Sequence, residues 1–172
     1  MRWLWCLRWF AAASVLRCSH LNRALCVNLN NNLQQTLIIA KRYNMKIPKG
    51  LHTITPYFTV SDADQLIEFV VQVFDGSILV IDRYPNGRIQ HARIGVGSSV
   101  IMLNECNEHY PANVSQMYLY VEDVESKYSK ALDAGAASIM EPNDRPYGDR
   151  IAGIKDPCGN IWWIAKHAGQ QQ

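Results

Sequence analysis

Residues 147–164, YGDRIAGIKDPCGNIWWI, combine two turn signals, a pair of opposite charges and two adjacent tryptophans. In its second turn, Asp156, Pro157 and Gly159 occupy the first, second and fourth positions of a β-turn, where these residue types are preferred. Apolar residues on both sides of this turn are typical of paired strands. The stretch therefore predicts a β-hairpin, and we interpret its turn residues as structural rather than catalytic.

The pattern of this hairpin belongs to a repeat with an offset of 61 residues and no gap. PYFTVSDAD at 56–64 aligns with MYLYVEDVE at 117–125, and Pro85 aligns with Pro146. The apolar positions repeat as well, which predicts an internal duplication, that is, two modules with the same topology.

Each module is predicted to contain one strand, one helix and three further strands. The first strands are expected at 54–60 and 115–121, each followed by a helix that begins at an Asp- or Ser-rich cap. The Asn86-Gly87 pair favours a two-residue type I′ turn between two of the later strands. Those later strands are expected at 77–83, 88–95, 99–105, 137–141, 150–155 and 160–166. The predicted fold class is therefore α+β, with two tandem βαβββ modules forming a curved mixed sheet around a cavity.

The charges are distributed unevenly along the chain. All fifteen acidic residues lie from Asp62 onward, whereas eight of the seventeen basic residues lie before residue 50. Residues 50–172 form an acidic body without a basic stripe, which argues against a nucleic-acid partner. The apolar run at the beginning of the chain is too short for a membrane span, so no membrane partner is expected either.

Residues 1–44 are expected to lie outside the fold. Our preferred interpretation is that Met45 is the true first residue; a mitochondrial transit peptide, indicated by scattered Arg residues and the absence of acids, is the alternative. Without that segment the chain has Cys106 and Cys158 and no C-x-x-C spacing, so a cytoplasmic location is expected and a disulfide framework is not.

The predicted domain covers residues 50–167. Module 1 is expected at about 52–106 and module 2 at about 113–167, followed by a polar tail at 168–172.

This organisation resembles the vicinal oxygen chelate superfamily, which includes glyoxalase I, extradiol dioxygenases and bleomycin-resistance proteins. The PhnB-like branch is the most similar, because its closing region has the pattern Y-G-D-R and then D-P-x-G-x-x-W, here at 147–150 and 156–162. That branch also has a His-Ala pair on a middle strand, here His91-Ala92. The chain departs from the branch at Asp75, where Gly is usual, and at Val70, where Tyr is usual.

The resemblance implies where a metal would bind. In metal-dependent members, four ligands come from the first and last strands of the two modules, and the corresponding positions here are Thr55, Met102, Gln116 and Trp163. An indole has no lone pair for a metal, and neither Thr nor Gln brings a charge. We therefore expect no metal cofactor, with a divalent metal as the alternative.

A trough without a metal is still a concave site for a small molecule. Trp163 is expected to face it and Trp162 to face the helices, because side chains alternate along a strand. His91, on a strand face with Ile89 and Arg93, is a candidate hydrogen-bond donor or general base. The candidate ligand-binding residues are Tyr57, His91, Met102, Gln116, Tyr147, Arg150 and Trp163.

Arg150 has two interpretations. It pairs with Asp149 at a surface, or it anchors a carboxylate or phosphonate through its planar guanidinium.

The expected function is that of a homodimer that binds a small aromatic or anionic molecule in a metal-free pocket. The alternative is a metal-dependent lyase, isomerase or dioxygenase of the same superfamily, so enzymatic activity is left open.

Overall fold

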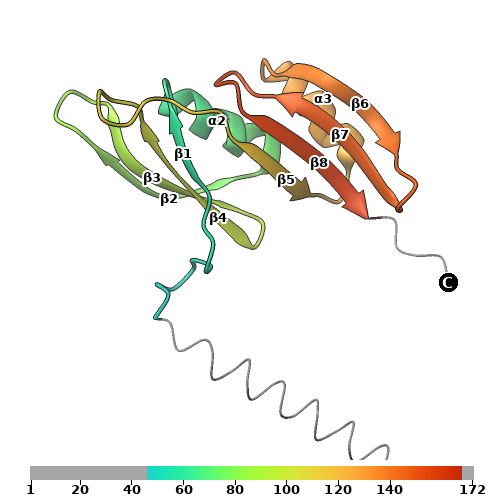
Figure 1. The fold of residues 1–172 in the computed structure, drawn as a ribbon, viewed down its shortest axis with the longest axis horizontal. Coiled ribbons are helices and arrows are strands. Elements are labelled where there is room, and N and C mark those ends of the chain that lie inside the picture. Colours follow the sequence, from blue (N-terminus) through green and yellow to red (C-terminus); the bar gives the residue numbers. More distant parts are fainter. Residues whose placement is uncertain (1–45, 168–172) are drawn as a thin grey trace, which may run out of the picture. The chain divides into compact units, whose positions relative to one another are not determined.

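The computed structural model describes residues 46–167, of which those from Ile47 onward belong to one compact unit (Figure 1). The segment 1–44 and the tail 168–172, both expected to lie outside the fold, are outside the described residues. In chain order, the elements are β1 (Tyr57–Val60), α2 (Ala63–Phe74), β2 (Ser77–Arg83), β3 (Ile89–Val96), β4 (Ser99–Glu105), β5 (Gln116–Tyr120), α3 (Val124–Asp133), β6 (Ala137–Asp144), β7 (Asp149–Lys155) and β8 (Ile161–His167).

The strands form two four-stranded sheets with the same topology. Their orders are β1-β4-β3-β2 and β5-β8-β7-β6, with the first and last strands of each module parallel and the other pairs antiparallel. Tyr57 is paired with Met102, and Tyr118 is paired with Trp163 in the same register. The fold class of two βαβββ modules is thereby confirmed. Neither helix among the described residues is long and apolar enough to cross a membrane.

One hydrophobic core serves both modules. The ring of Trp162 in β8 stacks on Phe58 of β1 at a centroid distance of 5.7 Å and also contacts Phe74 of α2 at 4.9 Å. All three side chains are buried, together with Leu66 of α2 and Ile164 of β8. The helix-facing sides of the two sheets therefore pack into one apolar interior, which leaves the opposite sheet faces for the concave surfaces.

The ends of the helices explain one departure from the PhnB-like pattern. Asp62 and Asp123 cap the two helices by accepting hydrogen bonds from the backbone. Asp75 ends α2 in the left-handed conformation, with φ of 53°, where Gly is normally preferred. Its carboxylate lies 2.5 Å from the Lys127 ammonium of α3, so the substitution joins the two helices. Val70, the other departure, is fully buried in the core.

The loop at Asn86-Gly87 is not the expected two-residue type I′ turn. Only Gly87 has a positive φ, and its backbone N–H donates to the carbonyl of Tyr84 at 2.9 Å, so Pro85 and Asn86 are the central residues. In such a turn Pro suits the second position and Gly suits the last position, where φ is positive. This explains why the sequence Pro-x-Gly recurs at 85–87, 146–148 and 157–159. The same bond closes the turns at 145–148 and 156–159, at 3.0 Å and 2.9 Å.

A β-bulge in β3 corrects the expected strand face. Ile89 and His91 pair with consecutive residues of β2, so Gln90 is the additional residue and the alternation is broken. Ile89 is consequently buried in the core and does not share the trough face of His91 and Arg93, as was expected. Arg93 pairs with Met102, and Gly153 pairs with Trp163. Arg93 is thus equivalent to Gly153, and the repeat offset in this strand is 60 instead of 61.

Two strand boundaries also differ from the expectation. β1 begins at Tyr57 instead of residue 54, since Thr55 bonds to the carbonyl of His52 at 3.1 Å and Pro56 has no N–H to donate. β6 extends beyond residue 141, because its pairing with β7 resumes after an irregularity, at Asn143 and Asp144.

Candidate ligand-binding site in module 2

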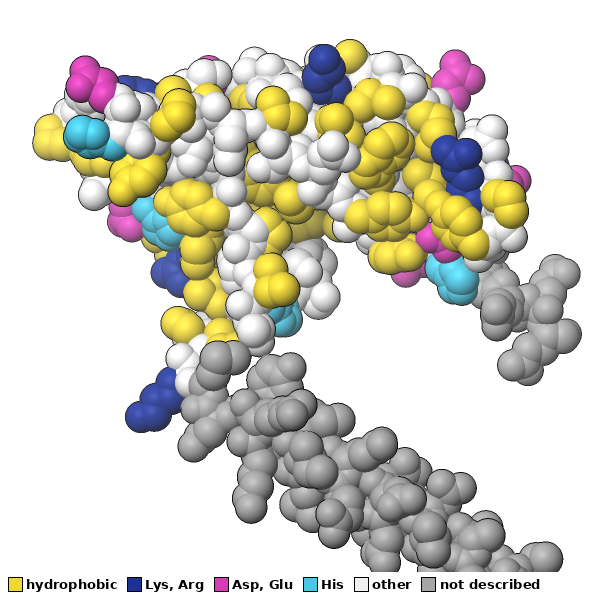
Figure 2. Space-filling view, in the orientation of Figure 1, with side chains coloured by type: hydrophobic (Ala, Val, Ile, Leu, Met, Phe, Trp, Pro, Cys, Tyr) yellow, Lys and Arg dark blue, Asp and Glu magenta, His cyan; other side chains and the backbone are white. Residues whose placement is uncertain are grey.

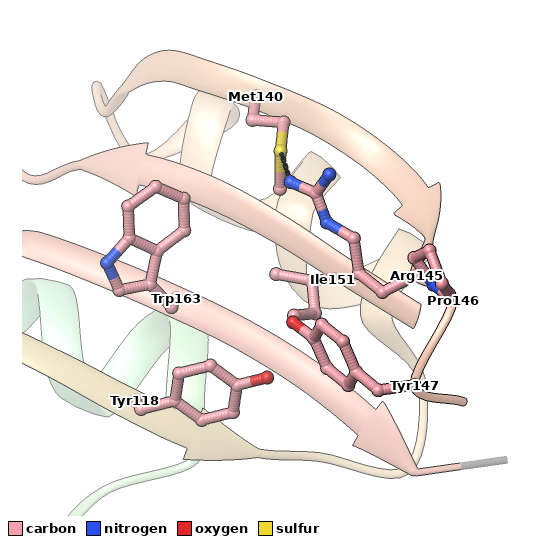
Figure 3. A pocket seen from close by; sticks show the side chains of 7 residues that line it. All are labelled: Tyr118, Met140, Arg145, Pro146, Tyr147, Ile151 and Trp163. Atoms are coloured by element: carbon pink, nitrogen blue, oxygen red, sulfur yellow. Dashed lines mark hydrogen bonds between the residues drawn. The ribbon is translucent and has the colours of Figure 1, made fainter. Parts of the chain in front are cut away.

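A cavity of 380 Å³ lies on the helix-free face of β5, β7 and β8 beside the turn 145–148. Figure 3 shows the aromatic rings of Tyr118, Tyr147 and Trp163 around it, and Figure 2 shows hydrophobic side chains gathered over these strands. Its wall is thus mainly apolar and aromatic, as is usual for small-molecule sites. The lining residues are Tyr118, Met140, Arg145, Pro146, Tyr147, Ile151 and Trp163.

Trp163 is held in place from two sides. A Cβ atom at Gly153, its partner on β7, would lie 2.6 Å from the indole Cζ3, so the ring packs directly over the bare backbone. The indole N–H also donates to Oε1 of Gln116 at 3.3 Å. The predicted ligand-binding residues Tyr147 and Trp163 therefore line the cavity, whereas Gln116 supports the indole from beside it.

Asp149 forms a buried hydrogen-bonding centre on the same sheet face as the cavity. Its Oδ2 accepts hydrogen bonds from the hydroxyls of Tyr118 and Tyr120 at 3.0 and 3.1 Å, and its Oδ1 lies 2.6 Å from Nδ1 of His167. The hydrogen bond from His167 lowers the pKa of Asp149 despite burial, and burial and the carboxylate raise the pKa of Tyr118. The network fixes the ring of Tyr118 in the cavity wall.

Arg150 does not form the expected pair with Asp149, and its guanidinium is already engaged by two other carboxylates. Successive side chains of β7 point to opposite faces, so Arg150 cannot meet Asp149. It instead pairs with Glu125 of α3 and, at 2.9 Å, with Asp144. Arg150, Glu125 and Asp144 are not among the residues that line the cavity.

The cation in the cavity wall is Arg145, which the sequence analysis did not single out. Its guanidinium donates to the sulfur of Met140 (Figure 3). Within residues 46–167, it forms no ion pair with a carboxylate. The signal that could have found it is the Pro-x-Gly turn, because loops that a rigid scaffold positions commonly carry binding residues and Arg145 begins the turn 145–148.

The other predicted residues lie in module 1, apart from this cavity. The rings of Tyr57 and His91 are stacked at a centroid distance of 6.1 Å. Met102 is the cross-strand neighbour of Arg93, whose Nε is buried without a partner among the described residues. The role of His91 as a hydrogen-bond donor or general base stays a prediction.

The positions implied for a metal do not suit one. Thr55 precedes β1 with its hydroxyl bonded to the backbone, and Gln116 is bonded to the indole of Trp163. The neighbouring tyrosine of each module is neutral in its present environment, since burial raises the pKa of Tyr57 and of Tyr118. Between residues 46 and 167 no three His, Cys, Asp or Glu side chains gather as a metal site would require.

The sequence also matches a known family. The family model described as "Glyoxalase/Bleomycin resistance protein/Dioxygenase superfamily" matches residues 50–164. The chain belongs to this superfamily. An uncharacterized protein of Mycobacterium bovis is 31% identical over 124 residues, which are 66% of this chain and 82% of the relative.

Solved structures of the superfamily share the fold. TioX from Micromonospora sp. ML1 has a TM-score of 0.59 at 24% identity, over 67% of this chain and 98% of that one. A PhnB protein from Bacillus cereus has a TM-score of 0.54 at 19% identity, over 67% and 99%. TnmS3, an antibiotic binding protein from Streptomyces sp. CB03234, has a TM-score of 0.56 at 21% identity, over 72% and 99%.

Proposed function

We propose that this protein binds a small, planar, anionic aromatic molecule in the module 2 cavity without a metal. The observation that carries the proposal is the combination of three aromatic rings with the guanidinium of Arg145, which has no carboxylate partner among the described residues. Rings stack on a planar ligand, and a guanidinium binds a carboxylate through two parallel hydrogen bonds. No side chain in the wall carries a negative charge that would oppose such a ligand.

Two further points support a binding protein over a metal-dependent enzyme. The residues at the metal positions offer an indole, a thioether, an amide and a hydroxyl, a donor set that does not compensate for dehydration of a divalent cation. TnmS3, which has the same fold, is an antibiotic binding protein. The preformed aromatic cavity and this donor set therefore favour ligand binding over metal-assisted lyase, isomerase or dioxygenase chemistry.

The proposal includes a homodimer. The rings of Tyr118 and Tyr147 are 48% and 64% exposed, so the cavity is open on one side. A second copy that covers this face would bury the exposed rings and exclude water from the ligand. A cytoplasmic location agrees with the free thiols of Cys106 and Cys158.

The test combines metal analysis with ligand titration of the full chain. We expect less than stoichiometric Zn, Ni, Mn or Fe after purification, no change in melting temperature with a chelator, and a rise in melting temperature with 2-naphthoate. Naphthoate should also quench the tryptophan fluorescence, and a Trp163→Phe variant should lose most of that quenching. Stoichiometric metal whose removal lowers the melting temperature would contradict the metal-free proposal.

Sedimentation measures the assembly separately. A single species with the mass of two chains supports the dimer, and a monomer at the concentration that binds naphthoate contradicts it.

A further inference from the structure

Module 1 contains a second and larger cavity with a different wall. It has a volume of 550 Å³ and lies where the 84–88 loop and the segment after β4 meet β1. Three tyrosines, three carboxamides and a threonine line it: Tyr57, Tyr84, Tyr110, Gln90, Asn104, Asn107 and Thr59. The wall contains no charged side chain, in contrast to the module 2 cavity with its Arg145.

The carboxamides are oriented but incompletely satisfied. Oδ1 of Asn107 accepts the backbone N–H groups of His109 and Tyr110, both at 2.9 Å, so its NH2 group points away from them. Asn104 is held by Thr59 at 2.9 Å and by the backbone carbonyl of Glu105 at 3.0 Å. Among the described residues, the Asn107 NH2 group forms no hydrogen bond, which leaves a fixed donor for a ligand.

Gln90 is directed by the β-bulge. It is the additional residue of β3, so its exposed side chain leaves the alternation of the strand and lines the cavity. Bulges commonly redirect a side chain at a binding site. No hydrogen bond to the Gln90 amide is formed within residues 46–167, although the group offers both donors and an acceptor.

Arg83 and Arg88, which adjoin the segments that line this cavity, are both engaged in ion pairs. Arg88 is paired with Glu105 at 3.1 Å and also donates to the carbonyl of Cys106. Arg83 is paired with Asp64 through two hydrogen bonds, at 2.6 and 2.9 Å. Because the wall itself contains no charged side chain, a charged ligand would be dehydrated here without a counter-charge in direct contact, which disfavours it against a neutral one.

From this wall we infer that module 1 holds a second binding site, for an uncharged, hydroxyl-rich ring such as a pyranose sugar. Tyrosine faces pack against the C–H face of such a ring, while the amides of Gln90, Asn104 and Asn107 exchange hydrogen bonds with its hydroxyls. Burial and the neighbouring Tyr84 raise the pKa of Tyr57, so its phenol stays a neutral donor. The site goes beyond the proposed function, because it uses another module and another ligand chemistry.

The experiment titrates the 15N-labelled full chain with methyl β-D-glucopyranoside and follows the side-chain amide signals by NMR. We expect saturable shifts of the Gln90, Asn104 and Asn107 amides with a millimolar Kd, and about fivefold weaker binding in Gln90→Ala, the loss of one neutral hydrogen bond. Tyr57→Phe, which removes one hydroxyl and keeps the ring, should weaken binding to a similar degree. Arg145→Ala should bind the glycoside unchanged, because that residue lies in module 2.

Two results would overturn the inference. One is the absence of shifts in these three amides at about 50 mM glycoside. The other is binding of D-glucuronate, the carboxylate analogue, as tight as that of the neutral glycoside. Neither result depends on naphthoate binding, so this site and the module 2 site are tested separately.

Discussion

The indole of Trp163 packs over the backbone of Gly153, so closely that a Cβ atom there would lie 2.6 Å from Cζ3 of the ring. The two residues are direct partners in the β7–β8 ladder. In module 1 the equivalent pair is Arg93 and Met102. The modules thus keep the same backbone register, and at this ladder position only module 2 combines a glycine with an aromatic ring that packs over it.

Gly153→Ala should displace the indole and weaken aromatic ligands. Both the ring and the strand backbone are fixed, so the added methyl group costs about 1–3 kcal/mol of stability, the range for overpacking. Thermal unfolding and naphthoate titration measure the two effects. In Gly153→Ala with Trp163→Leu the stability loss should be smaller than the sum of the single losses, because the clash is gone. Additive losses would show that the contact is not close.

The sequence predicted the backbone of the fold better than it predicted the site. The repeat located both modules, since Asp62 and Asp123 cap equivalent helices and β1 and β5 have the same partners. The prediction missed the Gln90 bulge, because strict alternation along β3 puts Ile89 on the face of His91 and Arg93, whereas the additional residue moves Ile89 to the core face.

The role of Asp149 was missed for a related reason. Its partners Tyr118, Tyr120 and His167 come from two other strands, and only the three-dimensional pairing brings them together. The adjacent charge of Arg150 suggested a local pair that strand alternation prevents.

Arg145→Ala should weaken benzoate more than the neutral benzamide. A charge-assisted hydrogen bond contributes about 1.5–3 kcal/mol, which corresponds to roughly a tenfold to hundredfold higher Kd for benzoate. Calorimetric titration of both ligands separates the charge from the ring contacts. Arg150→Ala is the matched control: it removes a cation held by Glu125 and Asp144 and should leave the benzoate Kd within about threefold. Equal losses in the two variants would refute a direct role for Arg145.

The natural chain with Asp75 should be less stable than the Asp75→Gly variant and more stable than the Asp75→Ala variant. Gly adopts the left-handed conformation without a steric cost, and Ala pays that cost while also losing the ion pair to Lys127. We expect Asp75→Ala to melt several degrees lower than Asp75→Gly, measured by thermal unfolding. In a Lys127→Met background, Asp75→Gly should raise the melting temperature more than it does in the natural chain, because the substitution then breaks no ion pair. Equal melting temperatures for the Ala and Gly variants would exclude the conformational explanation.

Cys158 should react slowly with alkylating reagents in the folded protein. Its sulfur lies 3.3 Å from the carbonyl oxygen of Asp62, and burial raises the pKa of the thiol from 9.0 to about 11. Two pKa units remove about 99% of the reactive thiolate, and the greater nucleophilicity of the remainder offsets part of this, so about tenfold slower labelling is expected. Peptide mass spectrometry after iodoacetamide treatment at pH 8 compares folded and unfolded chains. Equal rates would mean that the thiol is accessible and unperturbed.

Asp149→Asn should lower stability at neutral pH and have less effect in acid. The hydrogen bond from His167 and those from Tyr118 and Tyr120 hold the pKa of Asp149 below its ordinary value of 3.8. Because the folded state favours the ionised form, the carboxylate contributes stability above about pH 4 and loses that contribution as the pH falls through its lowered pKa. Thermal unfolding of the natural chain and the variant between pH 3 and pH 7 measures the difference.

The matched control for this pH series is Asp82→Asn, on β2. Asp82 is exposed and its side chain forms no hydrogen bond or ion pair within residues 46–167, so its replacement should change stability little at any of these pH values. A gap between the natural chain and Asp149→Asn that stays constant down to pH 3 would show that the carboxylate is needed for its shape and not for its charge. The expected convergence, together with weaker naphthoate binding in Asp149→Asn at pH 7, would establish that the ionised carboxylate positions Tyr118 in the cavity wall.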